Sequence, residues 1–128
     1  MDNKQSNHLV GKAVKLINNK FIVLEDASLI AESGRFMISL HGNYSTREVW
    51  LNGELLSPKE SQKIINHSPD GFSWGYGGSG PAQLALAILL KITSRETAMQ
   101  MYQDFKWDVI ASLPQSDIDV LIDVGKYQ

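Results

Sequence analysis

The first half of the chain alternates short apolar runs with turn residues, a pattern typical of β-strands. The Asn18-Asn19 pair fits a tight hairpin between two of these runs. Asn52-Gly53 is a stronger signal, because both central residues of a type I′ turn need positive φ. Residues 26–33 fit either a helical turn or a loop. The predicted strands are residues 13–17, 21–24, 35–40, 48–51 and 54–56.

The second half has the longer periodicity of helices. Residues 82–90 are almost all apolar, which predicts a helix buried on every side. Pro81 stands at its first position, where proline's fixed φ suits a helix and its missing N–H costs nothing. Gln83, two residues later, is expected to meet an N-terminal amide of the same helix.

Two further helices are predicted toward the C-terminus. One covers residues 94–112 and ends before Pro114. The other covers residues 116–123, because Ser116 and Asp119 have the spacing of a reciprocal helix cap. The amphipathic stripe of the first of these helices consists of Ala98, Tyr102, Phe105 and Val109.

These elements predict an α+β fold, in which a small antiparallel sheet from the N-terminal half packs against a buried helix and two further C-terminal helices. The 128 residues suit a single domain, residues 1–128, with residues 1–12 as a loosely held N-terminal segment.

Composition excludes several classes of function. The chain has no cysteine, which removes disulfides and thiolate chemistry. A formal charge of −2 argues against a nucleic-acid polymer as partner. The longest apolar run, residues 84–90, is far shorter than the roughly 20 residues that cross a bilayer. The polar N-terminus has no secretory h-region, so we expect a cytoplasmic protein with no membrane partner.

Glycine is concentrated in one segment, since five of the ten glycines fall between Gly71 and Gly80. Such a density costs backbone entropy and needs a reason. One reason is structural, because glycines let a loop thread past a buried helix. The other is ligand binding, because glycines let backbone amides approach a ligand beside a helix N-terminus that favours anions. The segment has neither the Lys-Ser/Thr pair of a Walker A loop nor the βαβ surroundings of a dinucleotide fingerprint.

Aromatic residues alternate with small ones in this segment. On a strand, Phe72, Trp74 and Tyr76 would share one face, which is either part of the core or a stacking wall for a nucleobase. Lys106 follows the glycine segment on a predicted helix and either reaches an anion there or pairs with a carboxylate such as Asp70 or Asp104. We expect no cofactor, no metal and no catalytic residue. The candidate ligand-binding residues are His67, Asp70, Trp74, Tyr76, Gly77, Gly78, Ser79, Gly80, Gln83 and Lys106.

His67 and Asp70 have a second interpretation as a general acid/base pair. The sequence His-Ser-Pro-Asp-Gly is also good turn chemistry, with proline at the second position. Both interpretations stay open at this point.

The chain closely resembles a small domain-of-unknown-function family that occurs in bacteria, archaea, phages and plasmids. The resemblance covers about residues 47–113 and rests on two motifs, HSPDGFSWGYGGSGPAQLALAIL at residues 67–89 and YQDFK at residues 102–106. The resemblance implies a gene context, because small accessory proteins of mobile elements often bind host defence components or their nucleotide signals.

Three functions follow as hypotheses. The first is a non-enzymatic protein that holds a phosphorylated small molecule or nucleotide at the glycine-rich loop, with sequestration of a defence signal as its possible role. The second is an inhibitor of a host defence complex, which would bind its host protein through the hairpin around Trp50 and Asn52-Gly53 together with the N-terminal region. The third is a hydrolase or transferase that uses His67 and Asp70. A homo-oligomer is compatible with all three.

Overall fold

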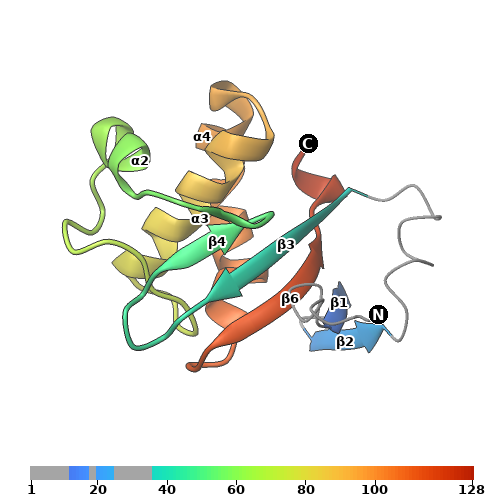
Figure 1. Ribbon diagram of the computed structural model, residues 1–128. Helices are drawn as coiled ribbons and strands as arrows, with labels where there is room; N and C mark the ends of the chain where they lie inside the picture. Colours follow the sequence, from blue (N-terminus) through green and yellow to red (C-terminus); the bar gives the residue numbers. More distant parts are fainter. Residues whose placement is uncertain (1–11, 18–19, 25–35) are drawn as a thin grey trace.

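The computed structural model describes residues 12–17, 20–24 and 36–128 (Figure 1). The expectations for residues 1–11, for the Asn18-Asn19 turn and for residues 26–33 lie outside the described residues.

A mixed sheet forms one layer of the molecule, in the order β2-β1-β6-β3-β4-β5. Neighbouring strands are antiparallel except β1 and β6, which run parallel. The predicted antiparallel sheet is therefore confirmed, and it gains a C-terminal strand in its centre. The strands are β1 (Lys12–Ile17), β2 (Lys20–Leu24), β3 (Met37–Gly42), β4 (Val49–Leu51), β5 (Glu54–Leu55) and β6 (Ile118–Asp123).

The hairpin between β4 and β5 has the predicted turn. Asn52 and Gly53 have φ angles of 53° and 84°, both in the left-handed region that a type I′ turn requires. The Asn52 side-chain oxygen accepts a hydrogen bond of 2.9 Å from the Ser39 amide of β3. The turn is therefore tied to the neighbouring strand as well as to its own.

Two long helices cover one face of the sheet (Figure 1). Helix α3 (Ser79–Ile92) is buried from Gly80 to Leu89, as the apolar run predicts. Helix α4 (Arg95–Asp108) begins after Ser94, whose hydroxyl accepts a hydrogen bond from the Thr97 amide. The residues of its predicted stripe are buried, and a 3-10 turn, Ile110–Ser112, completes the segment. A short helix, α2 (Lys59–Ile64), was not predicted.

The prediction of a helix over residues 116–123 is wrong, because Ile118–Asp123 is strand β6. The sequence here carries two conflicting signals: Ser116 and Asp119 have the spacing of a helix cap, whereas the apolar residues alternate with the period of a strand. Ile118, Val120 and Ile122 lie opposite Gly42, Leu40 and Ile38 of β3. Ile118 and Ile122 are buried, and Val120 packs against the core. The alternation prevails because it places these branched side chains on the face that the helices cover.

The core lies between this face of the sheet and α3. Leu40 of β3, Leu84 and Ile88 of α3, and Phe105 of α4 are completely buried. A sheet and a helix thus bury each other's apolar faces, which is the usual basis of an α+β domain.

A polar cluster anchors the C-terminus to the end of α4. The Tyr127 hydroxyl and the Lys126 ammonium both donate to Oδ2 of Asp108, at 2.6 Å and 2.9 Å. Burial alone would raise the pKa of Asp108, but the hydrogen bonds from Tyr127 and Lys126 and the charge of Lys126 outweigh it and lower the pKa. Burial and the neighbouring carboxylate raise the pKa of Tyr127.

This lowered pKa predicts a loss of stability in acid. Because the pKa of folded Asp108 lies below the ordinary value of 3.8, its contribution is complete above that value and disappears as the pH falls through the folded pKa. Asp108→Asn should therefore lower the free energy of unfolding at neutral pH by about 1 kcal/mol. The difference should shrink below the ordinary value, as measured by urea denaturation across the pH range. The control Asp70→Asn, at an exposed position, should show no such change. The same dependence of the free energy of unfolding on pH in both variants would contradict the stabilising role of Asp108.

Candidate functional site

Three loops meet the N-terminus of α3 at one end of the molecule. The indole nitrogen of Trp74 donates to the Ser116 carbonyl oxygen at 2.9 Å, and the Tyr44 amide donates to Asp117 at 2.8 Å. These bonds join the glycine-rich segment and the β3–β4 loop to the segment that leads into β6. The glycine-rich segment is thus bonded to the segment that leads into β6 before it enters α3.

Gln83 is the polar centre of this end. It is completely buried, and its side-chain oxygen accepts hydrogen bonds from the His67 and Ser68 amides at 2.8 Å and 3.0 Å. Its side-chain nitrogen donates to the Ser61 hydroxyl and to the Ile65 carbonyl oxygen. The prediction that Gln83 caps its own helix is wrong, because its amide is fully used by the segment before the glycines. Gln83 therefore organises the structure and has no bond left for a ligand.

Trp74 belongs to the core. It is fully buried, and its ring meets the edge of Tyr44 at a centroid distance of 5.3 Å. Phe72 is also buried, whereas Tyr76 is 44% exposed, so the three aromatics do not share one face. Of the two interpretations, the core is confirmed for Phe72 and Trp74, and a stacking role for Trp74 is wrong.

The loop glycines make room for side chains of the protein itself. A Cβ atom on Gly77 would lie 2.2 Å from the Trp107 ring, and one on Gly78 would lie 2.5 Å from the Tyr76 ring. Gly80 is buried against Ser73 in the same way. Close packing therefore explains these glycines structurally.

Both of these rings also remain partly exposed to solvent. Trp107 is 59% exposed, and together with the Tyr76 ring it flanks the short backbone stretch from Gly77 to Ser79. We call this surface the aromatic shelf, defined by Tyr76, Gly77, Gly78, Ser79 and Trp107. Trp107 was not among the predicted site residues. The sequence signal for it is an aromatic residue on the polar side of the amphipathic helix, next to the candidate residue Lys106.

Lys106 lies next to the shelf with an unusual degree of burial. Only 8% of the residue is exposed, and its ammonium nitrogen sits 4.2 Å from the centroid of the Trp107 ring. Within residues 36–128, this nitrogen has no carboxylate in ion-pair distance and no hydrogen-bond acceptor. The expected pairing with Asp70 or Asp104 is absent there. Its place in the last turn of α4 favours a positive charge but supplies no counter-ion.

The structure separates His67 from Asp70. The His67 ring nitrogen Nε2 shares a hydrogen bond of 2.8 Å with the Tyr102 hydroxyl of α4. Asp70 is exposed and lines a different cavity, beside Arg47. Across the described part of the chain, neither a hydrogen bond nor an ion pair joins His67 to Asp70, and no three metal-binding side chains gather. Ser79 is exposed at the start of α3.

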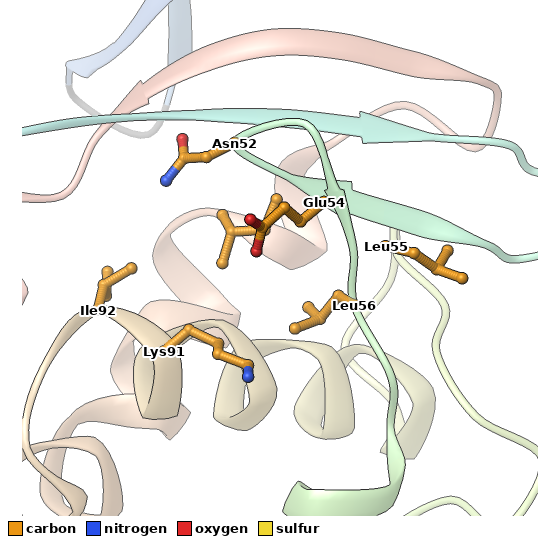
Figure 2. A pocket seen from close by; sticks show the side chains of 7 residues that line it. Asn52, Glu54, Leu55, Leu56, Lys91 and Ile92 are labelled. Atoms are coloured by element: carbon orange, nitrogen blue, oxygen red, sulfur yellow. The ribbon is translucent and has the colours of Figure 1, made fainter.

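Two cavities flank strand β5. The first, of about 260 Å³, lies between the β4–β5 hairpin and the C-terminal end of α3 (Figure 2). Asn52 and Glu54 line it from the hairpin, and Lys91 and Ile92 from the helix. The second cavity, of about 280 Å³, lies between the β3–β4 loop and Asp70.

Trp50, the expected anchor of a protein-binding surface, is only partly exposed. Its ring packs against the His41 ring at a centroid distance of 5.3 Å. The largest exposed aromatic side chain of the described residues is instead Trp107. In the described part of the chain no helix is both long and apolar enough to cross a membrane.

Comparison with known proteins gives a family and no function. The model of a family of unknown function (DUF6166) matches residues 40–123, from β3 to the end of β6. No curated protein and no solved structure matches the chain. The match agrees with the resemblance in the sequence and extends it at both ends.

The four hydrogen bonds of Gln83 predict a large effect of its loss. Gln83→Leu removes the partners of the His67 and Ser68 amides and of the Ile65 carbonyl oxygen, so the free energy of unfolding should fall by roughly 3 kcal/mol. Gln115 is a matched control, because its exposed side chain makes a single bond to the Gly75 carbonyl oxygen. Gln115→Leu should cost less than about 1 kcal/mol in the same urea titration. Equal decreases in the free energy of unfolding for the two variants would contradict the proposed weight of the Gln83 hydrogen bonds.

Gly77→Ala tests the packing of the shelf. The new methyl group would overlap the Trp107 ring, so the ring must move outward and become more accessible to solvent. Acrylamide should then quench the tryptophan fluorescence more strongly than in the parent protein. Gly125→Ala, whose nearest contact would be at 3.3 Å from an Asp123 oxygen, should leave quenching unchanged. Unchanged quenching in Gly77→Ala would contradict the described position of Trp107.

Proposed function

Because the chain belongs to DUF6166, a family of unknown function, we propose its function from the geometry: it binds a small anionic ligand that carries a planar ring, such as a nucleotide, at the aromatic shelf and Lys106. The proposed binding residues are Tyr76, Gly77, Gly78, Ser79, Lys106 and Trp107.

Lys106 carries this proposal, because its stem is buried and its ammonium has neither a carboxylate nor a hydrogen-bond acceptor within residues 36–128. Burial of the stem holds the ammonium over the Trp107 ring, in a cation–π contact worth about 0.5–1 kcal/mol. A phosphate or carboxylate of a bound ligand would pair with this positioned charge.

The exposed rings of Tyr76 and Trp107 favour a ligand that contains a planar ring. Tyr76 and Trp107 are fixed against the backbone of Gly78 and Gly77, so their orientation is set before a ligand arrives. A planar ring that stacks on such an aromatic side chain gains about 1–3 kcal/mol. A ligand that combines an anionic group with a planar ring would use both features.

The start of α3 adds a favourable field. Ser79 and Gly80 are the first residues of a 14-residue helix, whose N-terminus attracts negative charge. Pro81 removes one amide from this turn, so the helix contributes less than the lysine.

Binding without catalysis fits the groups present. The shelf has no paired acid and base within the described residues, and the hydrogen bond of the His67 ring goes to Tyr102. Sequestration of a nucleotide signal, which the family resemblance suggested, would need binding alone. That role remains part of the proposal.

Calorimetric titration with AMP, which combines a phosphate and a planar base, tests the function. We expect binding by the parent protein and an affinity at least about tenfold lower in Lys106→Met, because a charge-assisted hydrogen bond is lost while the apolar stem is kept. Trp107→Leu should also weaken binding, through loss of stacking. Adenosine, which lacks the phosphate, should bind the parent and Lys106→Met equally weakly.

Lys91→Met is the matched control for Lys106→Met. Lys91 lies at the opposite end of the α3–α4 hairpin, and its ammonium pairs with Glu60 at 3.7 Å. Its substitution should leave AMP binding unchanged. Equal binding by the parent and Lys106→Met, or no binding of AMP, ADP and ATP by the parent, would rule out the proposed function.

A further inference from the structure

The cavity of about 280 Å³ beside the β3–β4 loop combines an apolar wall with a charged rim. Its inner wall contains the buried side chains of Leu56 and Phe72. Its rim contains one guanidinium, that of Arg47, and the carboxylates of Glu48 and Asp70. An apolar wall with charges of both signs around it is typical of a site for a small molecule.

Arg47 has a backbone conformation that arginine rarely adopts. Its φ angle is 65°, in the left-handed region that disfavours a side chain with a Cβ atom. The Asn43 carbonyl oxygen accepts a hydrogen bond of 2.7 Å from the Arg47 amide and closes the turn. Glycine or asparagine would fit this position at lower cost, so the arginine side chain needs another explanation.

The Arg47 side chain is fixed by two contacts. Its guanidinium carbon lies 3.6 Å from the centroid of the Tyr44 ring, and Nε donates to the Ser73 hydroxyl at 3.2 Å. Among residues 36–128, the two terminal amino groups of the guanidinium have no hydrogen-bond acceptor and no ion-pair partner. A guanidinium whose two amino groups are both unused can form a bidentate pair with a carboxylate, which is the geometry arginine binds best.

The two carboxylates on the rim restrict the ligand further. Glu48 accepts a hydrogen bond of 3.2 Å from the Thr46 hydroxyl, and Asp70 has no hydrogen-bond partner within the described residues. A purely anionic ligand would be repelled by both. A ligand with an ammonium group beside its carboxylate would instead pair with both signs of charge at once.

We propose that this cavity binds a free α-amino acid with an apolar side chain. Arg47 would hold its carboxylate, Asp70 or Glu48 its ammonium group, and Leu56 and Phe72 its side chain. This site is separate from the aromatic shelf and does not depend on the function proposed there.

The test uses L-leucine and two analogues that each lack one charge. Leucine should raise the melting temperature of the full-length protein and give a saturable calorimetric signal. Leucine methyl ester, which has no carboxylate, and N-acetyl-leucine, which has no ammonium group, should each bind at least about tenfold more weakly than leucine. Equal binding of leucine and its methyl ester, or no binding of leucine, isoleucine, valine or methionine, would overturn the proposal.

Arg47→Lys keeps the charge and removes the planar fork, so it should weaken leucine binding at least about tenfold. Arg95→Lys, on the exposed start of α4, is the matched control and should bind like the parent. Should Arg47→Lys not fold, Asp70→Asn combined with Glu48→Gln tests the ammonium contacts instead. Undiminished leucine binding in the folded variants would overturn the assignment.

Two crossed measurements separate this site from the aromatic shelf. Arg47→Lys should bind AMP like the parent, and Lys106→Met should bind leucine like the parent. Loss of leucine binding in Lys106→Met would overturn the separate site.

Discussion

The completely buried amide of Gln83 is the interaction on which the functional end of this protein depends. A single side chain on α3 satisfies the His67 and Ser68 amides, the Ser61 hydroxyl and the Ile65 carbonyl oxygen. An apolar residue at this position would leave the two amides and the carbonyl oxygen without these partners, which would weaken the packing of α2 and the following loop on α3. That loop leads directly into the glycine-rich segment, so the same side chain helps to place the segment.

The close packing of the glycine-rich segment also forms the aromatic shelf. Gly77 and Gly78 admit the rings of Trp107 and Tyr76 so closely that no Cβ atom would fit. The rings therefore pack against backbone and still remain partly exposed to solvent, with the Lys106 ammonium over the Trp107 ring. Antiparallel pairing of α3 and α4 places the last turn of α4, with Lys106, at the same end. The structural explanation of the glycines and the binding hypothesis are thus compatible, because packing creates the rigid surface that a ligand would use.

Sequence reasoning succeeded where the determining interactions are local. The Asn52-Gly53 turn follows from two residues that tolerate positive φ, and the buried helix α3 follows from an unbroken apolar run. It failed where partners lie far apart in the chain. Strand β6 carries a local helix-capping pattern, but its place between β1 and β3 is decided by pairing that the sequence does not display. Trp107 was missed for the same reason, since its contact with Gly77 arises only when α4 returns along α3. Lys106 was predicted as a candidate from its place on the helix after the glycine segment, but the burial of its stem was not predicted.

The central claim is that the aromatic shelf and Lys106 form one binding site for an anionic ligand with a planar ring. A titration of the ¹⁵N-labelled protein with AMP, followed by two-dimensional NMR, tests it most directly because each amide and indole reports its own position. The account predicts that the largest shifts occur at the Gly77, Gly78 and Ser79 amides and at the Trp107 indole, with the Trp50 indole unmoved. Shifts centred on Trp50 and the β4–β5 hairpin, or an unchanged spectrum, would contradict it.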